Sequence, residues 1–116
     1  MREILQQLNE NADILGSIVI TPDGIMVAAA LQPDLEEEKI AAFTSSLLLT
    51  LKKSLQQLNN SGSMSFCTIN STEGKLIFFD LENSFLVLVS RPNAQITSCM
   101  EEINHAITEI QNRRVA

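Results

Sequence analysis

Tryptophan and tyrosine are absent from this sequence of 116 residues, and cysteine, histidine and basic residues are scarce. Eight lysines and arginines stand against fourteen aspartates and glutamates, which gives a formal net charge of −6. Proteins that bind nucleic acids usually carry a basic stripe, often with interleaved aromatic residues, that meets the phosphate backbone. The sequence has neither feature, so we expect no nucleic-acid partner.

The two cysteines are too few for the disulfide framework of a small extracellular domain. Cys67 and Cys99 both lie inside apolar patterns, and neither has a neighbouring histidine or aspartate that would indicate a nucleophile. A free cysteine in such a place behaves as a small buried apolar side chain. Both thiols are therefore predicted to be reduced and structural.

Motifs for catalysis and cofactor binding are also missing. His105, the single histidine, has no second histidine and no cysteine one helical turn away, as a typical metal site on a helix would need. The four glycines are isolated and form neither a GxGxxG motif nor a Walker loop. We predict no catalytic, cofactor-binding or metal-binding residue, and no cofactor. This pattern favours a binding or scaffolding module over an enzyme.

Long apolar runs do not occur either. No run approaches the roughly 18 apolar residues of a membrane span. The N-terminus, MREILQQLNENAD, is amphipathic and lacks the continuous apolar segment and cleavage site of a signal peptide. The length corresponds to one domain, residues 1–116. We expect a soluble cytoplasmic protein without membrane insertion.

What the sequence does contain is an alternation of helix and strand patterns. Thr21-Pro22-Asp23-Gly24 is a strong turn signal between two apolar runs. Asp34 can cap the long helix, and Asn93 can cap the last one. The predicted helices span residues 2–11 and 35–58 and a C-terminal segment that ends near Asn112. The predicted strands span residues 14–20, 25–31, 64–71, 75–81 and 84–90.

This order, α-ββ-α-βββ-α, predicts an α/β (α+β) fold with three layers, in which helices cover both faces of a five-stranded antiparallel sheet. Residues 85–89 are apolar on both faces, which is typical of a central strand. Residues 64–71 are less apolar, which suits an edge. The first and last helices each have one apolar stripe, so we expect them to share one face of the sheet, with the long helix on the other.

The long helix has an apolar arc wider than the roughly 100° that covers a core. One stripe is expected to face the sheet and contains Ile40, Phe43, Leu47, Leu51 and Leu58. A second stripe beside it contains Ala41, Leu48 and Leu55, followed by Ala42, Ser45 and Leu49. The helix is either buried deeply in its own monomer or packed between the sheet and a partner chain. The shortness of the chain favours the second reading.

Three segments carry a resemblance to a known family. GSIVITPDGIMVAA is similar to the first hairpin of the roadblock (dynein light chain) family. This resemblance implies a roadblock/profilin-like fold. IAAFTSSLLLTLKKSLQQL resembles its long second helix, although Leu47-Leu48-Leu49 is bulkier than the usual small-residue pattern. GKLIFFDLENSFLVLVSRPNAQITSCMEEI resembles its last hairpin and the step into the C-terminal helix. The similarity extends over essentially the whole chain.

The resemblance implies a homodimer in which the second helices pack antiparallel and the third strands pair into a ten-stranded sheet. The expected dimer interface contains Ala41, Ser45, Leu48, Leu49, Lys52, Met64, Phe66 and Thr68. The resemblance also implies a partner, because many bacterial and archaeal members of the family bind a small Ras-like GTPase on the paired helices and regulate its GTP hydrolysis or localisation without donating an arginine. The expected partner-binding residues are Lys39, Ala42, Ser46, Leu49 and Lys53.

Two alternatives belong to other functional classes. A small-molecule sensor of similar α/β/α build would need a pocket with a few polar groups aimed inward, and the apolar strands show no such cluster. An adaptor in a signalling complex would need only the exposed surfaces. A co-purified ligand would favour the sensor, and a stable complex with a GTP-bound GTPase would favour the regulator.

Overall fold

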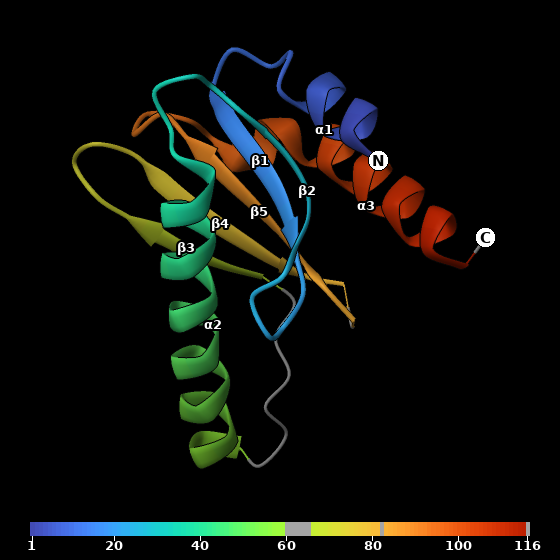
Figure 1. Ribbon diagram of the computed structural model, residues 1–116. Helices are drawn as coiled ribbons and strands as arrows, with labels where there is room; N and C mark the ends of the chain where they lie inside the picture. The colour runs from blue at the N-terminus through green and yellow to red at the C-terminus, as the bar shows by residue number, and fades with distance from the viewer. Residues whose placement is uncertain (60–65, 82, 116) are drawn as a thin grey trace.

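The structure of the protein is a computed structural model, and it describes residues 1–59, 66–81 and 83–115. Its elements follow the predicted order (Figure 1). They are α1 (Arg2–Leu8), β1 (Ile14–Ile20), β2 (Met26–Leu31), α2 (Glu37–Asn59), β3 (Phe66–Asn70), β4 (Lys75–Asp80), β5 (Phe85–Ser90), the short 3-10 helix η1 (Ile96–Cys99) and α3 (Met100–Val115).

The five strands form one sheet in the order β2-β1-β5-β4-β3, and each neighbouring pair is antiparallel. β5 occupies the centre, as its two-sided apolarity predicts, and its middle residues are almost fully buried. β3 forms one edge, as predicted, and β2 forms the other. The register of β1 and β2 shifts between Val19 and Ile20, which leaves Val27 as an extra residue in β2.

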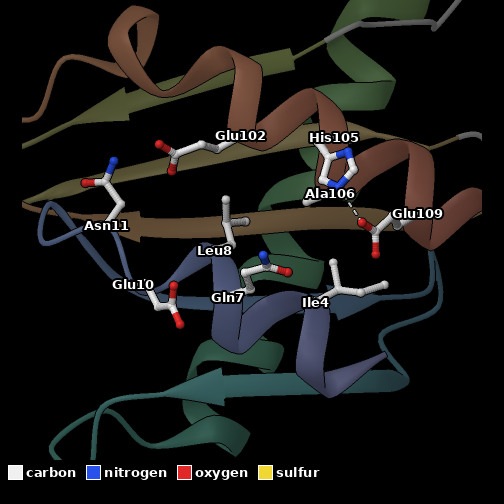
Figure 2. A pocket seen from close by; sticks show the side chains of 9 residues that line it. All are labelled: Ile4, Gln7, Leu8, Glu10, Asn11, Glu102, His105, Ala106 and Glu109. Carbon is white, nitrogen blue, oxygen red and sulfur yellow. Dashed lines mark ion pairs between the residues drawn. The ribbon is translucent and has the colours of Figure 1, made fainter.

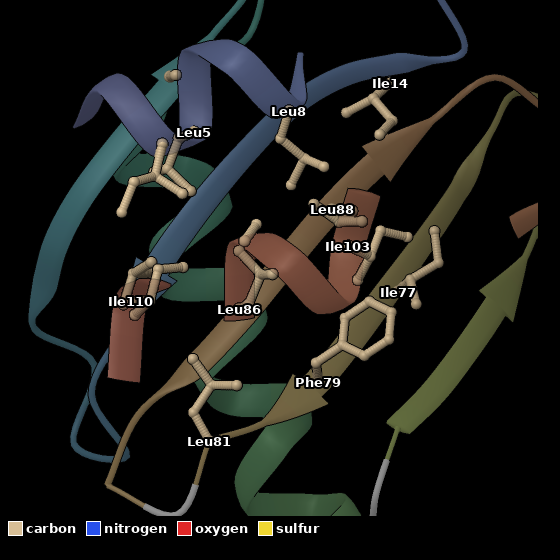
Figure 3. Packing of buried hydrophobic residues seen from close by; sticks show 14 of the residues in the cluster. Leu5, Leu8, Ile14, Ile77, Phe79, Leu81, Leu86, Leu88, Ile103 and Ile110 are labelled. Carbon is tan, nitrogen blue, oxygen red and sulfur yellow. The ribbon is translucent and has the colours of Figure 1, made fainter. Parts of the chain in front are cut away.

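Two apolar clusters fill the two sides of the sheet. The first lies under α1 and α3, where Leu5, Leu8, Ile103 and Ile110 pack on alternate residues of the strands (Figure 3). The second lies under α2 and includes Leu48. Figure 1 shows α1 and α3 together on one face and α2 on the other, which confirms the predicted layers. Each face of the sheet therefore has its own helical cover.

The first hairpin turns as its sequence predicts. Gly24 has a φ of 93°, a conformation that other residues rarely adopt, and its N–H donates to the Thr21 carbonyl at 3.0 Å. The Thr21 N–H in turn donates to the Ile25 carbonyl at 2.9 Å. This turn places Gly24 directly beside Ser45 of α2.

Several helix ends differ from the predictions. α2 begins at Glu37, two residues after the predicted start, so the predicted cap at Asp34 is wrong. α1 ends at Leu8, three residues before the predicted end, because successive turns over residues 9–14 lead directly into β1. The last helix begins as η1 after Gln95, which makes no side-chain cap, so the predicted cap at Asn93 is wrong. Residues 64 and 65 of the predicted third strand lie outside the described residues.

Candidate functional site

The side of α2 that faces away from the sheet is the first candidate site. The five residues predicted to bind a partner are all exposed and form what we call the outer arc: Lys39, Ala42, Ser46, Leu49 and Lys53. Leu49 is 55% exposed, which is high for a large apolar side chain. Lys39 pairs with Glu36 at 3.2 Å. The outer arc therefore combines an accessible leucine with two cationic side chains.

The rotation of α2 about its axis differs from the prediction. Ala41 and Leu48, expected at the dimer interface, belong to the cluster between α2 and the sheet, where Leu48 is only 2% exposed. Phe43, expected on the sheet, is 58% exposed. The assignment of Ala41 and Leu48 to an outward interface is thus wrong. The two stripes are adjacent, and a helix with such a wide apolar arc can present either one to the sheet.

The other residues expected at the dimer interface lie in several environments. Ser45 is half-buried against Gly24, so a turn of the same chain covers it. Thr68 is half-buried in β3 and pairs with Ile77 of β4. For Phe66 and Lys52 the structure describes the backbone, within β3 and α2 respectively. Met64 lies outside the described residues.

Beside α2 lies a hollow of about 460 Å³ over strands β4 and β5. We call it the apolar hollow, and its lining consists of Leu35, Lys39, Ile40, Phe43, Thr44, Leu76 and Val89. The hydroxyl of Thr44 is fully buried there and has no hydrogen-bond partner among the described residues. α2 therefore covers its side of the sheet only in part.

The free edge of the sheet lies next to this hollow. β3 pairs with β4 on one side and has no neighbouring strand on the other within the described part of the chain. Cys67 and Ile69 of β3 pack only partly against the core under α2. An unprotected edge strand beside an apolar surface is a common place for another chain to bind.

Sequence patterns did not identify a second exposed apolar pair at the first hairpin. Ile25 is 62% exposed and Val27 is 49% exposed. Val27 is the extra residue of the bulge in β2, and a bulge redirects a side chain. Strict alternation in the sequence cannot predict this outcome, because the extra residue changes which face each following side chain occupies.

On the opposite layer a cleft of about 320 Å³ separates α1 from α3 (Figure 2). We call it the α1–α3 cleft, and its lining consists of Ile4, Gln7, Leu8, Glu10, Asn11, Glu102, His105, Ala106 and Glu109. His105 is exposed, as predicted, and its Nε2 pairs with a carboxylate oxygen of Glu109. This cleft lies between two helices outside the sheet, and it differs from the internal pocket that a sensor would need.

The described residues contain no cluster of three or more histidine, cysteine, aspartate or glutamate side chains that could hold a metal ion. Cys67 and Cys99 are both free thiols. Cys67 packs on the α2 side of the sheet and Cys99 on the α1 side, so the sheet separates them. Within the described residues, no helix is both long enough and apolar enough to cross a membrane.

Comparisons with known proteins agree with this architecture. The family model of the Roadblock/LC7 domain matches residues 1–90. The chain belongs to the Roadblock/LC7 domain family. A comparison with curated protein sequences gave no match.

Solved structures of Roadblock/LC7 proteins share the fold over nearly the whole chain. A Roadblock/LC7 domain from Streptomyces avermitilis is 11% identical with a TM-score of 0.81, over 100% of this chain and 98% of that one. MglB of Myxococcus xanthus is 13% identical with a TM-score of 0.83, over 96% and 91% of the two chains. The gliding protein MglB from Thermus thermophilus is 14% identical with a TM-score of 0.77, over 95% and 84%.

Proposed function

We propose that this Roadblock/LC7 domain is a homodimeric, non-catalytic regulator or scaffold that binds a small Ras-like GTPase in the cytoplasm. The observation that carries the proposal is the incomplete cover that α2 gives the sheet. Phe43 and Leu49 are both more than half exposed on α2, and the apolar hollow lies beside Phe43. Exposed apolar surface of this kind marks an interaction site.

A second copy of the chain fits the flank of α2 that borders the apolar hollow. Ile40 and Leu47 are half-buried on this flank, and Phe43 extends from it into solvent. A second α2 placed there would cover these side chains and Leu76 of β4 together. It would also bring two β3 edges toward each other, and such pairing removes two free edges from solvent. In this arrangement Ile40, Phe43 and Leu47 replace Ala41 and Leu48 as interface residues.

The GTPase would bind the outer arc of the paired helices. Leu49 provides an apolar anchor, and Lys39 and Lys53 provide positive charge for acidic groups on a partner. Residues 35–59 contain no arginine. The outer arc therefore cannot supply an arginine that enters the nucleotide site, a group that in other systems accelerates hydrolysis strongly. Any effect on hydrolysis would come from positioning the GTPase's own residues.

The experiment that tests this function measures binding of small Ras-like GTPases encoded near this gene, each loaded with a non-hydrolysable GTP analogue or with GDP. We expect a complex in the GTP state, detected by size-exclusion chromatography and calorimetry. Leu49→Glu on the outer arc should weaken it at least tenfold, because a central apolar anchor becomes a charge. Gln111→Glu on α3 adds the same charge on the opposite layer and should leave binding unchanged.

Three results would contradict the proposal. The first is the absence of binding by any of these GTPases in either nucleotide state. The second is binding that Leu49→Glu and Gln111→Glu weaken equally, since only Leu49 lies on the outer arc. The third is a GTPase complex formed by a strictly monomeric protein, which would separate binding from the homodimer.

A further inference from the structure

The α1–α3 cleft lies on the layer opposite to the outer arc, and the proposed GTPase binding does not use it. Its α3 wall belongs to a helix that begins at Met100, beyond residues 1–90 that the family model matches. The cleft therefore depends on a helix that lies outside the residues matched by the family model. A ligand in the cleft would leave α2 and β3 free to bind other partners.

The walls of the cleft are apolar at the bottom and polar at the rim. Ile4 and Leu8 of α1 and Ala106 of α3 are buried and form the floor. Figure 2 shows the carboxylates of Glu10 and Glu102 near Asn11 at one end of the cleft, and the His105–Glu109 pair at the other end. The cleft thus places an apolar surface between acidic ends.

The charge of the rim is not neutralised by the chain itself. Three glutamates line the cleft, and His105 is its one basic lining residue. His105 pairs with Glu109, whereas Glu10 and Glu102 form no ion pair within the described part of the chain. Glu10 lies in the turn that follows α1 and Glu102 lies in α3, and both are exposed, so a cation that enters this end would meet carboxylates from both sides of the cleft.

We propose that the α1–α3 cleft is a docking site for a basic segment of a protein partner, with an arginine side chain inserted between the two helices. The aliphatic part of arginine would lie on Ile4, Leu8 and Ala106, because long cationic side chains pack their stems on apolar surface while the charged head stays near water. The guanidinium would lie at the end formed by Glu10 and Glu102. A volume of about 320 Å³ accommodates one such side chain together with part of its neighbours.

Arginine fits this cleft better than lysine. Its planar guanidinium presents five donors in a rigid fork that can contact carboxylates on two sides, and it is less strongly hydrated than an ammonium group. An ion pair between an arginine and a glutamate already connects α1 and α3 within the chain. Arg113 of α3 pairs with Glu3 of α1 at 3.5 Å. The proposed partner would make a second connection of the same kind.

The test selects binders from a random library of twelve-residue peptides displayed on phage, with the full-length protein as bait. We expect the selected peptides to be enriched in arginine next to apolar residues. The protein variant Glu10→Gln/Glu102→Gln should bind the strongest peptide at least tenfold more weakly. The matched control Glu38→Gln/Glu73→Gln removes the same charge from exposed sites outside α1 and α3 and should bind it normally. Circular dichroism confirms that each variant folds.

Two further measurements make the result decisive. Replacing the arginine of the selected peptide by citrulline, which keeps the shape and removes the charge, should also weaken binding at least tenfold. Amide chemical shifts should change in α1 and α3 and remain constant in α2. The proposal is overturned by a selection without basic enrichment or without binders, by equal binding of the citrulline peptide, or by equal losses in the two double variants. It is also overturned if free arginine binds as tightly as the peptide, because the cleft would then be a site for small cations.

Discussion

The hydroxyl of Ser17 in β1 donates a hydrogen bond of 2.9 Å to the side-chain oxygen of Asn9, immediately after α1. The amide nitrogen of Asn9 donates to the backbone carbonyl of Ala30 in β2 at 2.6 Å. One asparagine therefore connects the end of α1 to two strands. Ser17 is fully buried, so its hydroxyl depends on protein partners in place of water.

The first prediction concerns this connection. Asn9→Ala removes both hydrogen bonds and leaves Ser17 with a single long bond of 3.4 Å to the Leu5 carbonyl. A buried polar group that loses its partner costs about 1–3 kcal/mol. We expect the free energy of unfolding in urea to fall by that amount. Asn104→Ala, at an exposed position of α3, should change it by less than about 0.5 kcal/mol. Equal effects of the two variants would contradict the structural role of Asn9.

The second prediction follows from the rotation of α2. Leu48→Glu places a charge in the cluster between α2 and the sheet, where Leu48 is 2% exposed. The loss of a buried leucine and the burial of a charge together should cost at least about 3 kcal/mol. We therefore expect a large drop in the midpoint of urea unfolding, and the same drop at every protein concentration if the monomer itself is destabilised. A Leu48→Glu protein that keeps its stability but loses only its self-association would restore the original assignment of Leu48 to the dimer interface.

The element order, the layers and the position of β5 could all be predicted from the sequence. Apolar residues that recur every two positions indicate a strand, and apolar residues that recur every 3.6 positions indicate a helix. The same patterns show how many faces of each element are buried. For a domain of this size, the order of the elements and their buried faces leave few possible layer arrangements. The exposure of the outer arc could also be predicted, because it contains Lys39 and Lys53 and lysine side chains are rarely buried.

The rotation of α2 and the α1–α3 cleft could not be predicted in the same way. On α2 the stripe of Ile40 and Phe43 is as apolar as that of Ala41 and Leu48, and the contact with the first hairpin at Gly24 is visible only in three dimensions. The cleft joins α1 to a helix about ninety residues later in the chain. Periodicity describes each helix alone and contains no information on the gap between two of them.

The third prediction concerns the thiols. Cys99 is 2% exposed under α1, where the side-chain amide of Asn11 donates to its sulfur at 3.1 Å, whereas Cys67 is half-buried on the edge strand β3. We expect Cys67 to react with a thiol reagent in the native protein, and Cys99 to react only after unfolding. The single-thiol variants Cys67→Ser and Cys99→Ser identify each reaction. Rapid labelling of Cys99 in native Cys67→Ser protein would show that α1 does not cover it.

The fourth prediction concerns self-association. Phe43 is 58% exposed beside the apolar hollow, so Phe43→Glu should leave the fold of one chain intact and change its stability by less than about 0.5 kcal/mol. In a two-fold dimer the added charge appears twice and enters an apolar contact on both sides. We therefore expect wild-type protein to sediment as a dimer at micromolar concentration, and Phe43→Glu protein as a folded monomer.

Gln111→Glu is the matched control for this measurement, because it adds the same charge to an exposed position on the opposite layer. It should sediment as the wild type does. Cys67 provides a second readout, since it lies on the edge strand β3. If two β3 edges approach each other, its reaction with a thiol reagent should be slower in the wild-type dimer than in the Phe43→Glu monomer. A wild type that stays monomeric at these concentrations, or a Phe43→Glu variant that stays dimeric, would show that the flank of α2 beside the hollow does not form the interface.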